Sequence, residues 1–289
     1  MTAVNPSAPD AGTDPAAAGR EVVFAAKPLD LRAMSRRYRR TQYVNLAMPL
    51  LLLVVWQVLV ETGVLDQRFF SAPTSIVRTL WALGGSGELW TAIGATGRRV
   101  LVGFVLGALV GGLVGVAAAR VWIVRALVNP VVAATYPIPK IALLPVLLLI
   151  FGTGDTSIYL VVAVSVAYVV LMNTVAGVSN IPAIYQDVAR TLQVRGHRYL
   201  RTIAIPGALP VIFASLRTSW GIALVIDVAA EFTNSDTGLG RMILSAWQVF
   251  DIDTMYAGLV ITGLLGWLSF LVIDGIERLV IPWRRGLDG

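Results

Sequence analysis

Long apolar runs, separated by shorter segments rich in charge, glycine or proline, divide most of this chain. The run 100–119 is twenty residues long and carries no charge. As a helix rising about 1.5 Å per residue, it is long enough to cross about 30 Å of hydrocarbon. The whole pattern predicts six membrane-spanning helices, at about 44–60, 100–119, 126–151, 156–178, 206–231 and 255–273.

Composition supports an all-α, polytopic membrane protein. Of the 289 residues, 56% are hydrophobic and only 14% are charged, which is too apolar for an ordinary soluble domain. There is no cysteine and a single histidine, His197, so disulfides, thiolate metal sites and histidine-based relays are excluded. The net charge of +6 comes from basic residues at the ends of apolar runs. Orientation in a membrane explains that placement, and nucleic-acid binding is not expected.

The two ends of the chain are expected to lie in the cytoplasm. Residues 1–42 are rich in Ala, Pro and Gly without a sustained apolar period, which predicts a disordered tail. A transmembrane domain is predicted over 43–280 and a short tail over 281–289. With this topology the inside segments hold sixteen Lys and Arg and the outside segments hold five. That asymmetry satisfies the positive-inside rule, and it predicts a multi-pass protein of the inner (cytoplasmic) membrane.

Four glycines in the run 100–119 recur every four residues. A stripe of small residues on one helical face allows a neighbouring helix to approach closely, although glycine is also common in membrane helices generally. We therefore predict a helix-packing stripe at Gly103, Gly107, Gly111 and Gly115.

The run 126–151 contains four prolines and Lys140. Prolines at this density break a helix, and backbone freed within a membrane must be buried in protein or line a wet cavity. An unpaired charge facing lipid costs at least about 2.5 kcal/mol, so we expect Lys140 to pair with Asp227 or Glu231. These two carboxylates lie four residues apart and share one helical face. The predicted translocation path or gate comprises Pro137, Pro139, Lys140, Asp227 and Glu231.

The segment 187–210 is a polar, basic island between two apolar runs. Apolar residues recur at near-helical spacing over 187–200, and Arg190, Arg195, Arg198 and Arg201 give the rest a positive surface, which predicts a short amphipathic helix. Gly196 allows a bend, and Pro206 and Pro210 each suit the first turn of a following helix. The segment therefore predicts a helix–turn–helix on a membrane surface. A plain basic tether is the alternative interpretation.

In this island the order acidic-x-Ala-x-x-Leu, a basic helix and Ile-Pro-x-Ala-Leu-Pro resembles the EAA loop of binding-protein-dependent ABC transporter permeases. The similarity is greatest to the branch that handles nitrate, sulfonates and taurine. In that family the loop, here about 182–206, is a coupling helix that docks in a groove of the ATPase subunit. The resemblance implies an ATPase-coupling set of Asp187, Val188, Ala189, Leu192, Gln193, Gly196, Ile205 and Pro206.

Two positions of this loop depart from the family pattern. Asp187 replaces a glutamate, whereas Val188 and Ala189 stand for the two alanines. Gln193, thirteen positions before Pro206, replaces a glycine. That second change is the more serious, because glycine makes such a turn at lower cost. Gly196 is the candidate to take over the turn.

The resemblance covers about residues 60–280, including Tyr136-Pro-Ile-Pro-Lys140, Phe151-Gly-Thr-Gly154 and Ala230-Glu231 with Gly238-Leu-Gly240. It implies the type I ABC importer permease fold and a path for a small solute such as a sulfonate, taurine or nitrate. The implied partners are a second permease copy in a homodimer or heterodimer, a cytoplasmic ABC ATPase dimer and an extracytoplasmic substrate-binding protein.

Chemistry is expected to reside in a partner. The sequence holds no Gly-x-x-x-x-Gly-Lys-Ser/Thr phosphate loop, so ATP hydrolysis belongs to another chain, and no catalytic residue, metal or cofactor is predicted. Two other functions stay open. An ion-coupled secondary transporter would use Lys140, Asp227 and Glu231 as a relay, but it would also show two similar halves with matched broken helices. A non-transporting membrane scaffold is the other alternative.

Overall fold

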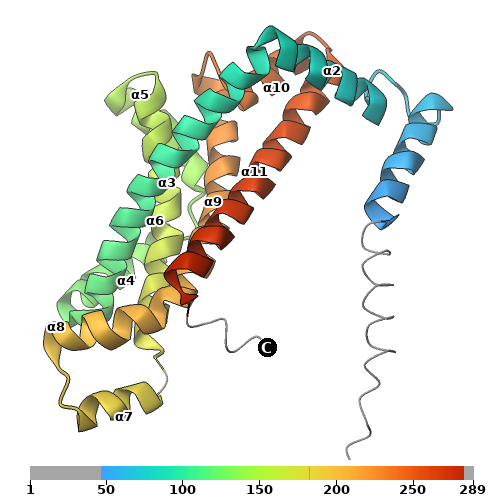
Figure 1. The fold of residues 1–289 in the computed structure, drawn as a ribbon. Helices are drawn as coiled ribbons and strands as arrows, with labels where there is room; N and C mark the ends of the chain where they lie inside the picture. Colours follow the sequence, from blue (N-terminus) through green and yellow to red (C-terminus); the bar gives the residue numbers. More distant parts are fainter. Residues whose placement is uncertain (1–46, 182, 283–289) are drawn as a thin grey trace, which may run out of the picture. The chain divides into compact units, whose positions relative to one another are not determined.

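The computed structural model describes residues 47–181 and 183–282, and over this part of the chain all regular structure is helical (Figure 1). The all-α prediction is confirmed there. The predicted tail 1–42 and most of the predicted tail 281–289 lie outside the described residues. Apart from the helix Ala47–Glu61, the elements discussed below belong to one compact unit that begins at Leu53.

Four helices in the described part are long and apolar enough to cross a membrane: α3 (Glu88–Arg120), α6 (Asp155–Ser179), the continuous run Gly196–Asn234 and α11 (Ile252–Val280). A bent pair, Trp122–Thr135 with Lys140–Phe151, makes a fifth if it is counted as one span. The first predicted span corresponds to a shorter apolar helix, Ala47–Glu61. Six spans are compatible with this arrangement and stay a prediction.

The bent pair is the predicted broken span. Helix α4 (Trp122–Thr135) is followed by the 3-10 turn η2 (Lys140–Leu143) and helix α5 (Leu144–Phe151), and the two parts meet at 95°. Pro137 and Pro139 lie in the gap between them. Proline removes a backbone donor and crowds the preceding turn, so the helix ends there.

Helices α3 and α6 run in the same direction (Figure 1). The chain returns from the end of α3 to the start of α6 through α4, η2 and α5. All four stripe glycines are buried, and each lies against α6. A Cβ atom on Gly111 would stand 2.5 Å from the carbonyl oxygen of Ala167, and one on Gly103 would stand 2.7 Å from the Cβ of Val162. Side chains at these positions would therefore force the two helices apart.

Helix α9 (Ile205–Asn234) runs antiparallel to α3 and α6 and completes the core. A cluster of buried apolar residues fills the space among these helices, with Val100 from α3, Ile158 and Val166 from α6, and Ala223 from α9. Helix α11 packs beside α9 and α10 (Leu239–Gln248).

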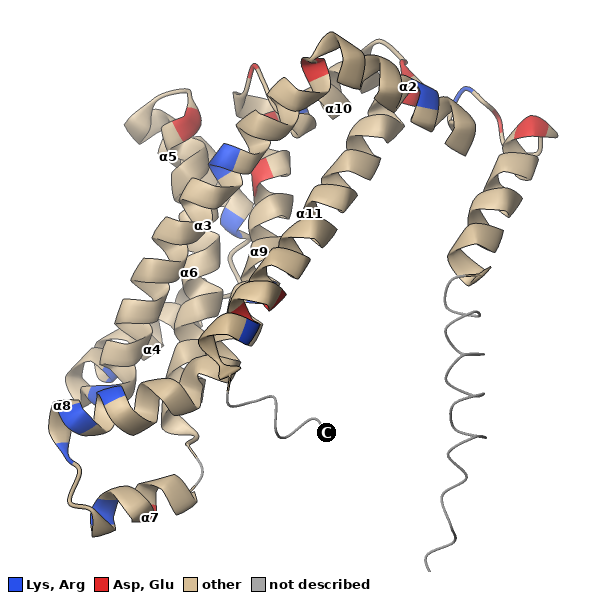
Figure 2. Cartoon of the chain, in the orientation of Figure 1, with Lys and Arg blue, Asp and Glu red and all other residues tan. Residues whose placement is uncertain are grey.

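The bundle has two distinct ends (Figure 1). At one, α10 and α2 (Pro73–Ser86) lie near the start of α3; at the other lie α7 (Ala183–Thr191) and α8 (Gly196–Tyr199). We call these the α10 end and the α7–α8 end. Arginines gather on α7 and α8 and on the turn between α3 and α4, whereas acidic residues are more frequent at the α10 end (Figure 2).

Candidate functional sites

The basic island forms two helical pieces where the sequence predicted one helix over 187–200. Helix α7 stops at Thr191, and α8 starts at Gly196. Beyond α8 the chain continues through the π-helical turn η3 (Leu200–Ala204) directly into α9. Pro206 lies in the first turn of α9 as expected, whereas Pro210 lies inside it and starts no new helix.

Gln193 causes the break. Its φ of 53° is left-handed, and its N–H donates to the carbonyl of Arg190 at 3.1 Å. The N–H of Val194 reaches back to the carbonyl of Ala189 at 2.9 Å. These two bonds are a Schellman motif, whose left-handed position is usually glycine. The glutamine itself therefore makes the turn at the family's glycine position, and Gly196, with φ 60°, makes a second bend.

Helix α7 turns apolar side chains away from the rest of the chain. Ile184, Tyr185, Val188 and Leu192 are all exposed, and we call them the α7 apolar face. Ala189 lies off this face and is only 3% exposed, so its side chain packs within this chain. Asp187 is exposed and pairs with Arg190 at 3.1 Å. Ile205 and Pro206, at the start of α9, are half-buried.

Lys140 binds backbone carbonyls at the bend between α4 and α5, and it pairs with neither Asp227 nor Glu231. Its Nζ donates to the carbonyl oxygens of Thr135 at 2.8 Å, Ile138 at 2.9 Å and Tyr136 at 3.2 Å, and it lies 4.2 Å from the ring centroid of Tyr168. The predicted pairing with Asp227 or Glu231 is therefore wrong. The physical reason is local, because the end of α4 leaves carbonyls without helical partners and a cation five residues on can reach them.

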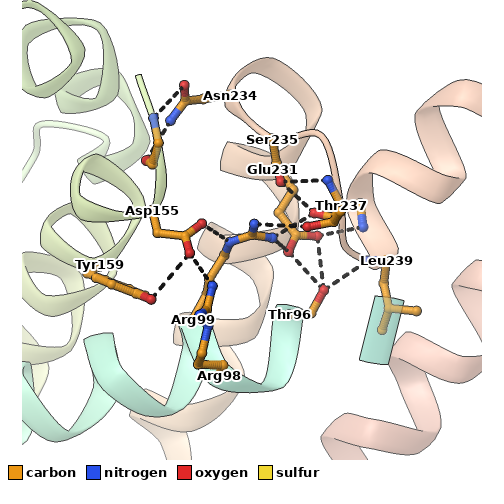
Figure 3. Close-up of polar contacts among 12 residues, drawn as sticks. Thr96, Arg98, Arg99, Asp155, Tyr159, Glu231, Asn234, Ser235, Thr237 and Leu239 are labelled. Atoms are coloured by element: carbon orange, nitrogen blue, oxygen red, sulfur yellow. Dashed lines mark hydrogen bonds and ion pairs between the residues drawn. The ribbon is translucent and has the colours of Figure 1, made fainter. Parts of the chain in front are cut away.

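Glu231 pairs with Arg99 at the α10 end, and Arg99 is the centre of a buried polar cluster (Figure 3). Arg99 Nη1 donates to Glu231 Oε1 and to the carbonyl of Thr237, both at 2.7 Å, and Nε donates to Asp155 Oδ1 at 2.6 Å. Both Arg99 and Glu231 are almost completely removed from solvent. A buried pair of this kind is held by its additional hydrogen bonds as well as by charge.

Further donors complete the shell of Glu231. The hydroxyl of Thr96 donates to Oε1 at 2.8 Å, and the N–H of Gly240 donates to Oε2 at 2.7 Å. A Cβ on Gly238 would stand 2.5 Å from Oε2, and one on Gly240 would stand 2.8 Å from the Cβ of Glu231. The Gly238-Leu-Gly240 motif is thus explained, since only glycine lets the start of α10 come this close to the carboxylate.

Asp155 closes the cluster on its other side. It opens α6 and accepts from Arg98 as well as from Arg99. Nearby, the side chain of Asn234 donates to the carbonyl of Gly154 at 3.0 Å. Side chains from α3, α6 and α9, with backbone from the start of α10, therefore meet at one point and fix the α10 end of the bundle.

The surroundings of Asp227 differ from those of Glu231. It lies one turn before Glu231 in α9, it is completely buried, and neither of its oxygens has a hydrogen-bond partner among the described residues. The sequence placed both carboxylates on one face, but the two environments differ. Glu231 is saturated with donors and Asp227 has none.

Sequence reasoning missed Arg99, Asp155 and Thr96 as members of this cluster. Arg99 is one of the five basic residues of the predicted outside segments, with Arg68, Arg78, Arg98 and Arg241, and no further role was predicted for it. A signal was present, because Arg99 directly precedes the run 100–119, Asp155 directly precedes the run 156–178, and Glu231 ends the run 206–231. In the predicted topology all three fall at the outer surface, so charges of both signs meet at one level.

A shallow groove lies between α6 and α9. Its volume is about 470 Å³, and its walls include the polar but uncharged residues Asn173, Ser215 and Thr218. Arg217, which directly precedes Thr218 in α9, pairs with Asp274 and Glu277 of α11, each at 2.7 Å. Among the described residues, no three or more His, Cys, Asp or Glu side chains are arranged to hold a metal ion.

Comparison with known proteins agrees with this architecture. Residues 103–286 match the family model described as the binding-protein-dependent transport system inner membrane component. The chain is 31% identical to a putative aliphatic sulfonates transport permease protein, SsuC, of Bacillus subtilis, over 85% of this chain and 89% of the relative. It is 27% identical to the taurine transport system permease protein TauC of Escherichia coli, over 91% and 98% of the two chains.

A third relative and a solved structure extend the comparison. The nitrate import permease protein NrtB of Synechococcus elongatus is 29% identical over 81% of this chain and 88% of its own length. A structure of the MetNI methionine ABC transporter in inward-facing conformations aligns with a TM-score of 0.55, at 22% identity, over 67% of this chain and 94% of that one. That likeness establishes the fold. This chain therefore belongs to the family of inner membrane components of binding-protein-dependent transport systems.

Proposed function

We propose that this chain forms the translocation path of an ATP-driven ABC importer for a small solute, such as a sulfonate, taurine or nitrate. Family membership makes it a transport subunit and not an enzyme, with ATP hydrolysis in a separate chain. The relatives named for sulfonates, taurine and nitrate support this substrate class. The uncharged polar groove at Asn173, Ser215 and Thr218 suits brief contacts with a small polar solute.

The observation that carries the proposal is the α7 apolar face. The nine-residue helix exposes three large apolar side chains, and Leu192 directly after it exposes a fourth, whereas Asp187 and Arg190 are exposed at other positions of the helix. Charges at these positions make lipid an unsuitable neighbour, whereas a groove on a partner protein would cover the apolar side chains. We assign this partner as the ABC ATPase, and we assign Asp187, Val188, Leu192 and Gln193 to the contact or its immediate support.

Ala189 has a different role in this proposal. Because it is buried within its own chain, it sets the distance between α7 and the rest of the loop and does not touch the ATPase. Gly196, Ile205 and Pro206 connect α7 to the continuous helical run that ends at the Arg99 cluster. Motion of α7 on ATPase closure would therefore be transmitted along α9 as a rigid-body movement.

Orientation and assembly follow from the same proposal. We assign the α7–α8 end to the cytoplasm, because arginines gather there (Figure 2). The proposed topology then has both termini in the cytoplasm and the α10 end outside. An extracytoplasmic binding protein would deliver the solute at the α10 end, and a second permease copy would complete the path. Pro137, Pro139 and Lys140 shape the bend, and Asp227 and Glu231 act at the gate.

Val188→Glu tests the proposal. It puts a charge in the middle of the α7 apolar face, where an unpaired interfacial charge costs about 2–5 kcal/mol. We expect the chain to insert normally but to lose most of the co-purifying ATPase and all ATP-dependent uptake of radiolabelled taurine, methanesulfonate or nitrate. Arg190→Gln is the matched control, because it makes the same change in net charge on the opposite face of α7.

Three results would contradict the proposal. Equal ATPase recovery and uptake for Val188→Glu and the wild type would show that α7 is not the coupling element. Uptake that follows an ion gradient without any ATPase would favour a secondary transporter. Recovery of the ATPase with no uptake of any small solute would favour a scaffold.

A further inference from the structure

The carboxyl group of Asp227 lies in the core of the bundle without a polar partner among the described residues. It is completely buried in a membrane-spanning helix, and neither oxygen is hydrogen-bonded among the described residues. Carboxylates in such places are normally paired, because an isolated one is strongly disfavoured. The state described here therefore leaves an unfavourable, unpartnered group in the core.

Arg99 is the candidate partner by position. Asp227 and Glu231 are four residues apart, so they lie on the same face of α9, about 6 Å apart along its axis. Arg99 already meets this face from α3, where its Nη1 is 2.7 Å from Glu231 Oε1. Because α9 runs towards the α10 end, a shift of α9 by one turn in that direction would bring Asp227 level with Arg99.

We propose that Asp227 is the second binding position for the Arg99 side chain, and that Arg99 passes from Glu231 to Asp227 during the transport cycle. This inference rests on the proposed function, in which α9 carries the movement of α7. One-turn displacements between packed elements are a known form of switching, and two carboxylates one turn apart provide two discrete positions.

The groups that Arg99 would leave behind support this exchange. Glu231 keeps the N–H of Gly240 as a donor, because Gly240 follows α9 in the chain and can move with it. Asp155 keeps Arg98, which pairs with its second oxygen. Neither acceptor would be stranded by the departure of the guanidinium, whereas Asp227 would gain its only charged partner.

Asp227→Asn in the purified permease–ATPase complex tests the inference, since it removes the charge and keeps the shape. Two states are compared, nucleotide-free and trapped with ATP and orthovanadate. We expect the apparent Tm of the nucleotide-free complex to be unchanged or higher, because Asp227 makes no hydrogen bond in that state among the described residues. The trapped complex should melt at a lower temperature than the wild type, and ATP-dependent uptake should fall about tenfold or more.

Two further variants separate a positioning role from a structural one. Asp227→Glu restores the charge and should recover much of the uptake. In Arg99→Met, the trapped complex should no longer respond to Asp227→Asn, because the interaction that the second change removes is already absent. Glu231→Gln should show the opposite pattern and lower the Tm of the nucleotide-free complex.

Uptake by Asp227→Asn within about twofold of the wild type would overturn the inference, and so would an equal loss of Tm in both states. In either case the wild-type complex still assembles and transports, so the proposed function survives. Failure of the wild-type chain to bind an ATPase would overturn the proposed function, and this inference with it.

Discussion

Arg99 and Glu231 join α3 to α9 through an ion pair of 2.7 Å, although they lie 132 residues apart in the sequence. Both side chains are withdrawn from solvent, and both have further partners in the same cluster. This ion pair holds α3 against α9 at the α10 end, just as glycine packing allows α3 to lie against α6. One contact depends on charge and the other on the absence of side chains.

Removal of Arg99 should therefore be costly. Arg99→Met leaves Glu231 buried beside an apolar side chain, and the expected loss of unfolding free energy is about 3–5 kcal/mol. Thermal denaturation of the purified chain measures this loss. Arg98→Met is the control, because Arg98 also pairs with Asp155 but its side chain is 62% exposed, and we expect about 0–1 kcal/mol. Equal losses for the two variants would contradict a special role for the buried pair.

A single methyl group should distinguish two adjacent glycines of α3. Gly111→Ala places Cβ 2.5 Å from the carbonyl oxygen of Ala167, so the helices must separate and stability should fall by about 1–3 kcal/mol. Gly112→Ala meets nothing within 4 Å and should be tolerated. The larger change Gly107→Leu should prevent assembly. Recovery of folded protein from membranes, together with its Tm, gives the comparison, and normal recovery of Gly107→Leu would contradict it.

Gln193→Gly should stabilise the end of α7. The left-handed conformation costs a non-glycine residue about 1–2 kcal/mol, and glycine removes most of that cost. We expect a small rise in Tm with uptake retained. Gly196→Ala, at φ 60°, should do the reverse. A lower Tm for Gln193→Gly would show that the glutamine side chain makes a contact that outweighs the strain.

Lys140→Met should weaken the bend between α4 and α5. Its three carbonyl partners lose a charged donor, and the expected loss is about 1.5–3 kcal/mol. Lys140→Arg should retain much of the stability, because a guanidinium can also donate to carbonyl oxygens. Protease accessibility of the segment 136–143 reports whether the bend has opened. Full stability of Lys140→Met would mean that the prolines hold the bend without help.

Features that repeat locally were predictable from sequence. The four-residue spacing of the stripe glycines indicated a close helix contact, and α6 indeed lies against that face of α3. The proline cluster indicated a broken span, and a 95° bend occurs there. Both signals act over a few residues, so no knowledge of the tertiary structure was needed to find them.

Partners distant in sequence were not predictable in the same way. Lys140 was expected to find a carboxylate, but the carbonyls freed by its own bend were nearer. Ala189 was expected to face the ATPase, and its burial follows from how the loop folds back, which helical spacing alone does not show. Helix α7 ends early because Gln193 accepts a conformation that propensity assigns to glycine.

The turn at Gln193 has a further consequence, which concerns local opening. Breaking the last turn of α7 releases the backbone strain at Gln193, so this turn is easier to unwind than one closed by glycine. About 1 kcal/mol of strain raises the open population about fivefold. Amide hydrogens at Val194 and Leu192 should therefore exchange with solvent faster than those in the middle of α7. The segment that would meet the ATPase is, in this sense, already partly prepared to change shape.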